Sequence, residues 1–298
     1  MTIICFGGYF VTKVLVAGAS GKLGAEILLE LKKQNIATRA LVRNPLSLRS
    51  KPDELFIADA RNTDQLKGIC ENVDIVISAM GASLQLGKTK DKATFQAVDY
   101  QGNKNILEQA LNAGARKFIY VSLAGAANMA GLAYVEAHEA FVSELKKSGI
   151  NYSIIRPTGF FYLFEEVLKM ARRKVVPLFG EGKVKTNPIH EADLAEICVQ
   201  AINSTETEIK AGGPVVYTRR EIAELAAEVL GQTPRFIHVP PQLANLLIAP
   251  VKLFDRRMGE LLAFGVAVNL INAVAPCLGR QNLADYFATL VKKNRNKI

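Results

Sequence analysis

The sequence has no tryptophan and only three histidines in 298 residues, which leaves little material for a histidine-based metal site. Its four cysteines (Cys5, Cys70, Cys198 and Cys277) are far apart and form no C-x-x-C pair. This spacing argues against a structural zinc site and against a disulfide framework. We therefore expect no metal, and the cysteine usage fits a reducing compartment, with a cytoplasmic location as the expectation.

Long hydrophobic runs are also missing. The closest approach to 18 uncharged apolar residues is 261–277, which Asn269, Asn272 and Pro276 interrupt, so no transmembrane segment is expected. The apolar residues 1–10 lack a basic region and a clear cleavage site, so a signal peptide is not predicted. The net charge is +9, but no basic stripe alternates with aromatic residues. A nucleic-acid partner is therefore not favoured.

The most informative segment that is present is 13–24. Four apolar residues run into Gly18, Gly21 and Gly24, and an amphipathic stretch follows at helical spacing. This pattern indicates a buried parallel strand, a tight turn and a helix N-terminus that can face a pyrophosphate. The alternative is a merely structural glycine turn. The predicted dinucleotide contacts from this loop are Gly18, Ser20, Gly21, Lys22, Leu23 and Gly24.

The segment 38–45 indicates which dinucleotide the site prefers. An NAD-selective site places a carboxylate about 20 residues after the glycines, to accept from the ribose 2′-hydroxyl. Arg43 stands there instead, with Arg39 four residues earlier and Lys22 in the loop. A guanidinium can pair with a 2′-phosphate. The sequence therefore favours NADP(H) over NAD(H), and the alternative is two solvated arginines at a strand end.

Alternating strand and helix patterns continue to about residue 156. They predict an α/β protein with a Rossmann-like, doubly wound parallel sheet, and ligands of such sheets lie across the carboxyl ends of the strands. The loops at those ends add further predicted cofactor contacts: Asp59, Ala60, Ala79, Met80, Gly81, Pro157 and Phe160. Phe161, Tyr162 and Phe164 either line the same cavity or pack in a helical core.

The predicted organisation is an NAD(P)-binding domain over 12–160 and a smaller mixed substrate or lid region over 161–298, interleaved with the first. Within the latter, 241–275 is rich in leucine, isoleucine, alanine and valine. Core or lid packing is one interpretation of this segment. A hydrophobic substrate pocket, or a weak membrane-surface contact aided by Lys252, Arg256 and Arg257, is the other.

Several further motifs carry a family resemblance. Besides the glycine loop they are the runs 42–45, 99–103, 121–122, 148–161, 179–182, 188–194 and 212–218. Together they resemble the NmrA-like atypical short-chain dehydrogenases/reductases, in the branch of divinyl chlorophyllide 8-vinyl reductase. The resemblance covers nearly the whole chain, is specific for the superfamily and is weak for any substrate.

The resemblance implies catalytic residues. Reductases of the superfamily usually hold Tyr-x-x-x-Lys, whose lysine lowers the tyrosine pKa while the phenol transfers a proton. The matching positions here are Tyr134 and His138, so histidine replaces the lysine. Either His138 works protonated, or another group transfers the proton, or no such catalysis occurs and both residues only pack. Ser122 lies in the region where the family has its catalytic serine. The alternative is that its hydroxyl only binds the local backbone. His190 is interpreted as structural.

Two functions follow as expectations. The first is an NADPH-dependent oxidoreductase, a reductase of a small hydrophobic carbonyl or conjugated alkene. The second, motivated by His138, is a non-catalytic NADP-binding sensor or assembly factor. An epimerase or dehydratase is a third option, but it depends even more on the missing lysine.

Overall fold

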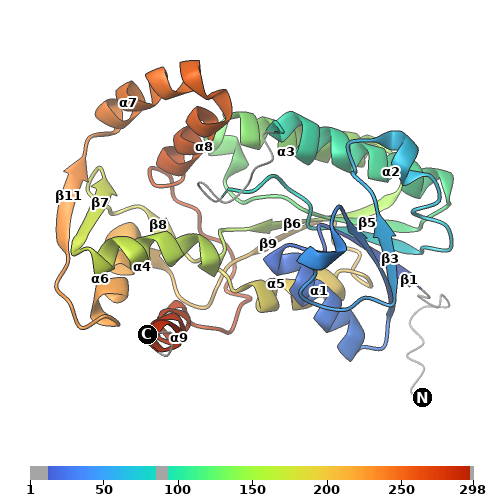
Figure 1. Ribbon diagram of the computed structural model, residues 1–298, viewed down its shortest axis with the longest axis horizontal. Coiled ribbons are helices and arrows are strands. Elements are labelled where there is room, and N and C mark those ends of the chain that lie inside the picture. The colour runs from blue at the N-terminus through green and yellow to red at the C-terminus, as the bar shows by residue number, and fades with distance from the viewer. Residues whose placement is uncertain (1–12, 85–92, 296–298) are drawn as a thin grey trace.

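The computed structural model describes residues 13–84 and 93–295, so residues 1–10, for which no signal peptide was predicted, lie outside the described part. A parallel sheet of seven strands forms the centre, in the order β3-β2-β1-β4-β5-β6-β9 (Figure 1). The strands are β1 (Lys13–Ala17), β2 (Ala37–Val42), β3 (Glu54–Ile57), β4 (Ile75–Ser78), β5 (Lys117–Val121), β6 (Asn151–Pro157) and β9 (Glu208–Ala211). The predicted Rossmann-like fold class is confirmed.

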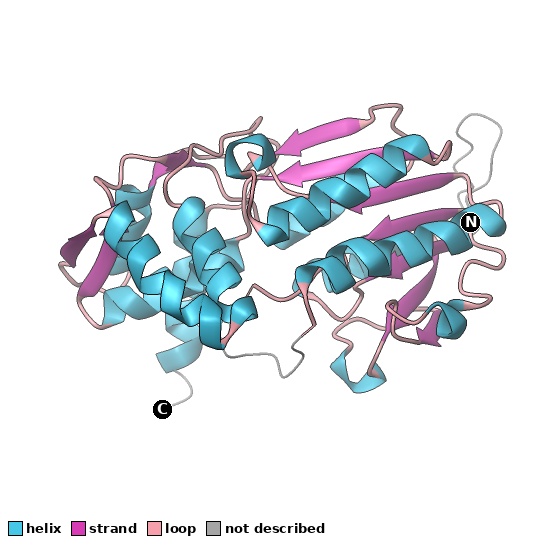
Figure 2. Cartoon of the chain, turned by 90° about the horizontal axis from the view of Figure 1, so that it is seen from above, coloured by secondary structure: helices cyan, strands magenta, loops and turns pink. Residues whose placement is uncertain are grey.

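Helices cover both faces of this sheet. On one side lie α1 (Lys22–Lys33) and α5 (Glu191–Gln200), and on the other α2 (Asn103–Asn112) and α3 (Ala133–Lys147) (Figures 1 and 2). Successive side chains of β1 alternate between the two cores, so its whole length is apolar. The unbroken hydrophobic run in the sequence reflects this double burial.

The helical segment between β4 and β5 is not uniform. It begins with a π-helical turn, Gln96–Gly102, and continues as α2. This turn carries the fully buried Asp99. Such irregular turns are frequent at functional sites, because the extra residue redirects side chains.

The C-terminal region forms its own small core. Its elements are α4 (Glu165–Arg172), β7 (Val175–Phe179), β8 (Lys185–Thr186), β10 (Tyr217–Thr218), α6 (Arg219–Glu228), β11 (Arg235–Val239) and α9 (Leu283–Arg295). Leu168, Val176, Ile222 and Phe287 pack together in it. Thr218 and Glu221 form a capping box at the start of α6. Between these elements the chain returns to the main sheet as α5 and β9, so the two regions interleave.

Two further helices, α7 (Pro241–Phe254) and α8 (Arg256–Ala267), pack against each other at one end of the molecule (Figure 1). α8 also contacts α3, which brings the segment 241–275 next to the main domain. Among the described residues, no helix combines the length and apolar character needed to cross a bilayer.

Candidate active site

A cleft runs along the carboxyl ends of the central strands. It has two adjoining chambers, which share Gly21, Arg43, Ala79, Met80, Gly81 and Val98. The proximal chamber has a volume of about 180 Å³ and is also lined by Gly18, Ser20, Leu41, Val42, Ala58, Asp59, Ala60 and Arg61. The distal chamber has a volume of about 340 Å³ and adds Lys22, Leu23, Gly24, Arg49, 82–84, Val121, Ser122, Tyr134, His138, Phe160, Tyr162 and Arg257. The structure thus brings nearly all the predicted cofactor positions to one cleft.

The glycine loop brings three backbone segments into close approach. Gly18 has a φ of +78°, and a Cβ there would lie 2.6 Å from the Ala79 carbonyl oxygen. A Cβ at Gly24 would lie 2.2 Å from the Gly18 carbonyl oxygen, so α1 can approach β1 only without a side chain. No side chain caps the N-terminus of α1, and its first turn has no acidic residue. These open N–H groups fit the phosphates of a dinucleotide.

We predict different outcomes for alanine at two of these glycines. Gly21 has ordinary backbone angles, and its added Cβ would meet only the Gly18 carbonyl oxygen at 3.2 Å. Gly21→Ala should therefore keep the free energy of unfolding within about 1 kcal/mol but weaken dinucleotide binding roughly tenfold, because its methyl group occupies the phosphate approach. Gly24→Ala should destabilise the fold by about 2 kcal/mol or more.

Urea denaturation and calorimetric titration measure both effects. Gly265→Ala in α8, where an added Cβ meets nothing within 4 Å, is the matched control and should change neither quantity appreciably. Equal effects of Gly21→Ala and Gly24→Ala on stability would contradict this division of roles.

Two arginines reach the proximal chamber. Arg43 follows β2, and Arg61 follows β3 together with Asp59. Arg61 donates from Nε to both Asp59 oxygens at 2.9 and 3.0 Å. The Arg61 hydrogen bond keeps the pKa of Asp59 below its usual range, and the Arg43 charge adds to this. The carboxylate is therefore neutralised locally, and the chamber can accept a further negative group.

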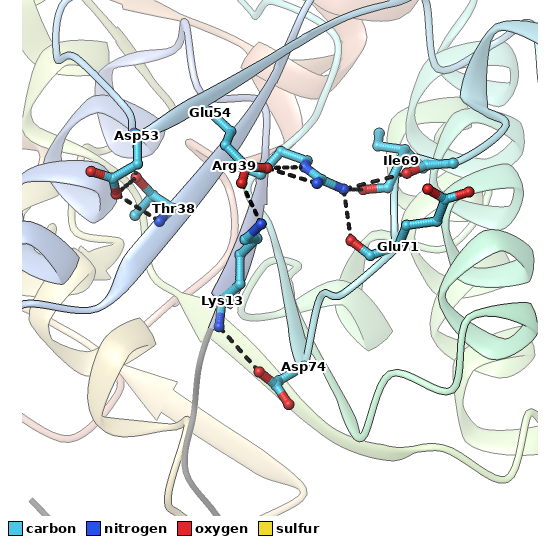
Figure 3. A network of polar contacts seen from close by, with 9 residues as sticks. Lys13, Thr38, Arg39, Asp53, Glu54, Ile69, Glu71 and Asp74 are labelled. Carbon is cyan, nitrogen blue, oxygen red and sulfur yellow. Dashed lines mark hydrogen bonds and ion pairs between the residues drawn. The ribbon is translucent and has the colours of Figure 1, made fainter.

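Arg39 does not join them, contrary to the expectation that it would support Arg43. Its Nε donates to Glu54 at 2.8 Å, and Nη1 donates to the Ile69 and Glu71 carbonyl oxygens at 2.7 and 3.0 Å (Figure 3). Glu54 also binds Lys13 at the start of β1. Arg39 therefore ties β2 to β3 and to the loop before β4, away from the carboxyl ends.

Lys22 links the glycine loop to the C-terminal region. Its Nζ lies 2.6 Å from Oε1 of Glu165 and 4.7 Å from the centre of the Tyr162 ring. The same Glu165 oxygen accepts from the Tyr286 hydroxyl at 2.6 Å. One carboxylate thus connects the loop, α4 and α9, and the Lys22 ammonium lies beside the distal chamber.

Aromatic rings surround Tyr134 in the distal chamber. The Phe264 ring of α8 packs at 4.6 Å and the Phe95 ring at 5.3 Å, both edge-on. Arg257, also from α8, lies over Phe95. The pKa of Tyr134 is raised well above 10, chiefly by burial and further by the Asp99 charge. The segment 241–275 therefore contributes a wall of the cleft, and Tyr134 keeps its proton.

His138 lies under Tyr134 with ring centres 4.5 Å apart. Its Nδ1 is 2.6 Å from the Tyr120 hydroxyl, and its Nε2 is 3.2 Å from Oδ1 of Asp99, without the alignment of a hydrogen bond. The position that the family resemblance assigns to lysine thus contains an imidazole enclosed by a phenol and a carboxylate.

Ser122 lines the distal chamber but is also bound by its neighbours. Arg156 donates from Nη1 to the Ser122 hydroxyl at 3.3 Å and to Glu139 at 2.6 Å. The Ser122 hydroxyl in turn lies 3.4 Å from Oε1 of Glu139. The structure thus gives Ser122 an orienting ion pair that the sequence did not indicate.

Of the remaining candidate site residues, some line the cleft and others pack in the core. Phe160 and Tyr162 line the cleft with stacked rings, whereas Phe161 and Phe164 pack in the C-terminal core. Pro157 does not line either chamber, because it ends β6 and pairs with β9. His190 caps α5, with Nδ1 accepting from the Ala192 N–H at 3.1 Å. No group of metal-binding side chains occurs within the ranges described.

Sequence reasoning missed Arg61, Asp99 and the α8 residues. The first could have been found, because Arg61 follows a predicted strand by four residues. Asp99 gave a weaker signal, a lone acid between apolar residues of a predicted helix. The sequence indicated 241–275 as one candidate for a hydrophobic pocket but did not single out Phe264, and it assigned Arg257 to a membrane contact; the packing of α8 against α3 brings Arg257 to the cleft and Phe264 to Tyr134.

Together the fold and cleft define a dinucleotide-binding α/β protein. Comparison with known families agrees, because the family described as NAD(P)H-binding matches residues 18–205, more than half of the chain. The chain belongs to this family and to the NmrA-like atypical short-chain dehydrogenases/reductases, so the resemblance seen in the sequence is confirmed.

Relatives of known description differ in role. The chain is 27% identical to divinyl chlorophyllide a 8-vinyl-reductase of Arabidopsis thaliana, with 94% of this chain and 77% of that protein covered. It is 22% identical to photosystem II assembly factor Ycf39 of Trieres chinensis, with 87% and 82% covered. The NADPH complex of quinone oxidoreductase QOR2 from Escherichia coli has a TM-score of 0.74 at 19% identity, covering 93% of this chain and 99% of that one. That likeness establishes the fold alone.

Proposed function

We propose that this protein is an NADPH-dependent reductase of a hydrophobic carbonyl or conjugated alkene. The observation that carries this proposal is the continuity of the cleft. It leads from Arg43 and Arg61, past the glycine loop, to the aromatic distal chamber that contains Tyr134. The relative named as a divinyl chlorophyllide a 8-vinyl-reductase supports the same activity.

The two chambers suit the two ends of NADPH. Arg43 and Arg61 would bind the 2′-phosphate, because a guanidinium pairs with phosphate in bidentate geometry. The open N–H groups at the start of α1 would hold the pyrophosphate. The bound cofactor would supply hydride in the distal chamber. There Phe160, together with Tyr134 and the Phe95 and Phe264 rings packed behind it, would exclude water from an apolar substrate.

Tyr134 would act as a proton donor. Burial raises its pKa well above 10, so the phenol stays protonated at physiological pH. A protonated phenol can give a hydrogen bond or a proton to a carbonyl oxygen, but it cannot act as a base. This supports reduction over the epimerase and dehydratase options, which need a base.

The test is NADPH consumption with a panel of quinones and enones. Turnover with any member supports the reductase. Selective binding of NADPH without turnover across a broad panel would instead support the second candidate, a non-catalytic NADP-binding assembly factor. The observation that favours this candidate is His138 in place of the lysine, together with the similarity to a protein named as an assembly factor.

We also propose that α7 contacts an anionic membrane surface. Its solvent side carries a continuous apolar arc consisting of Leu243, Leu246, Leu247, Pro250, Leu253 and Phe254. The last two are 86% and 93% exposed. In the sequence, Lys252 precedes this tip and Arg256 follows it, where Arg256 pairs with Glu260 at 2.9 Å; α7 itself has no acidic residue. Basic residues next to an exposed apolar tip suit a surface of anionic lipid.

Replacing both Leu253 and Phe254 with serine should lower vesicle binding by about 30-fold or more, because each buried side chain contributes about 1 kcal/mol or more. Flotation with phosphatidylglycerol-containing vesicles at low salt measures this. Leu46→Ser, at an equally exposed leucine elsewhere, is the control and should bind like wild type. Absence of wild-type binding to these vesicles would refute the membrane contact.

A further inference from the structure

Basic side chains dominate the charge of the distal chamber. Its described lining contains no aspartate or glutamate and four cations, which are Lys22, Arg43, Arg49 and Arg257. The neighbouring carboxylates are engaged outside this lining: Glu165 pairs with Lys22 at 2.6 Å, and Asp99 accepts from the Ala82 N–H at 3.1 Å. A cavity with this balance of charge favours ligands that carry a negative group.

The dinucleotide accounts for three of these four cations. Lys22 belongs to the glycine loop, and Arg43 and Arg49 follow β2. They lie on the side of the cleft where the proposed site holds the phosphates. Arg257 comes instead from α8, which forms a different wall beside Phe95 and Tyr134. The nicotinamide end of the cofactor carries no phosphate, so the charge of Arg257 calls for a different ligand.

The guanidinium of Arg257 is held at the chamber wall by contacts with another segment. Its Nη1 donates to the Ala93 carbonyl oxygen, and its centre lies 5.8 Å from the centre of the Phe95 ring. Phe95 is itself only 1% exposed, so it offers a fixed surface for this cation. A guanidinium has five N–H donors in a rigid fork. A bond to one carbonyl oxygen is therefore compatible with bidentate binding of a carboxylate.

The Phe95 ring also relates Arg257 to the proposed proton donor. Its centre is 5.3 Å from that of the Tyr134 ring, so one aromatic side chain connects the guanidinium with the phenol. Phe160 and Tyr162 line the same chamber with stacked rings, 5.4 Å apart. A flat apolar molecule can therefore lie along these rings, with its reacting group at Tyr134 and an anionic group at Arg257.

We propose that the substrate is an aromatic or conjugated compound that carries a carboxylate, and that Arg257 binds this carboxylate. This inference rests on the proposed reductase and specifies its substrate class. The aromatic wall receives the body of the molecule. The planar fork of Arg257 pairs with both carboxylate oxygens, which fixes the orientation of the substrate as well as its charge. A neutral substrate of the same shape lacks this pairing.

Matched pairs of ligands test this assignment. One pair is benzalacetone with a para-carboxylate or a para-carboxamide, and the other is anthraquinone with a ring carboxylate or carboxamide. Calorimetric titration into the NADP⁺-loaded protein measures their binding independently of turnover. We expect at least one carboxylate to bind about tenfold or more tightly than its amide. Arg257→Gln should abolish this advantage, and Arg257→Lys should retain part of it, because lysine keeps the charge without the fork.

Arg256→Gln is the matched control, because Arg256 pairs with Glu260 at 2.9 Å and lines neither chamber. It should preserve the preference for the carboxylate. If Arg257→Gln weakens both members of a pair equally, Arg257 only holds α8 in place and the inference is wrong. It is also wrong if wild-type protein binds no carboxylate more tightly than its amide, a result that needs no variant.

The same ligands separate this inference from the proposed function. Selective carboxylate binding without NADPH oxidation across the quinone and enone panel would contradict the reductase but retain the carboxylate site. NADPH oxidation with equal use of carboxylates and amides would support the reductase and refute only the role of Arg257.

Discussion

Replacing Tyr134 with phenylalanine should lower the turnover of NADPH with an active quinone or enone by about 100-fold or more, with little change in NADPH affinity. The hydroxyl is the group in the distal chamber that combines a retained proton with an apolar setting. Loss of a positioned general acid typically costs 10²- to 10⁴-fold, whereas the aromatic packing with Phe95 and Phe264 survives in phenylalanine. Stopped-flow and steady-state measurements of NADPH absorbance separate binding from turnover.

The matched control is Tyr217→Phe, which removes the same hydroxyl from a residue in the C-terminal region, outside the cleft. It should retain wild-type turnover. Because the pKa of Tyr134 is raised, the wild-type rate should also stay flat as the pH rises to about 9. Full activity of Tyr134→Phe would assign proton transfer to another group.

Replacing Arg43 with glutamate should weaken NADPH binding by about 100-fold and leave NADH binding nearly unchanged. The change removes a charge-assisted hydrogen bond to the 2′-phosphate and adds a repulsive carboxylate, together about 3 kcal/mol. Arg43 borders both chambers, and Arg61, the other cation of the proximal chamber, also binds Asp59 and so compensates only in part. Competition of the two dinucleotides for one site gives the selectivity directly.

Lys67→Glu is the control for a charge reversal, because Lys67 is exposed and pairs with its neighbour Asp64, away from both chambers. It should preserve the selectivity for NADPH. A parallel loss of NADPH and NADH affinity in Arg43→Glu would mean that Arg43 supports the loop instead of recognising the phosphate.

The fold was largely predictable because its signals are local. The apolar run of β1, the glycines and the start of α1 are contiguous, and each follows from backbone sterics or double burial. Arg39 shows the limit of such reasoning. It is only four residues from Arg43, but it lies within β2 and opposite Glu54, so its side chain finds partners beside the strand. The four-residue spacing between Arg39 and Arg43 does not by itself show that only Arg43 reaches the cleft.

The distal chamber was less predictable because its walls come from distant segments. Lys22 and Glu165 are 143 residues apart, and the choice of partner depends on how α4 docks. Phe264 reaches Tyr134 only because α8 packs on α3. The histidine at position 138 was visible in the sequence, but its meaning depended on Tyr120 and Asp99, which surround it in the fold.

The most direct measurement of the central claim is a calorimetric titration of the purified protein with NADPH and with NADH. A cleft that runs from Arg43 to Tyr134 predicts one site per chain and NADPH bound at least about tenfold more tightly than NADH. Equal affinity for the two would contradict the assignment of Arg43. Absence of binding for both would contradict the assignment of the cleft itself.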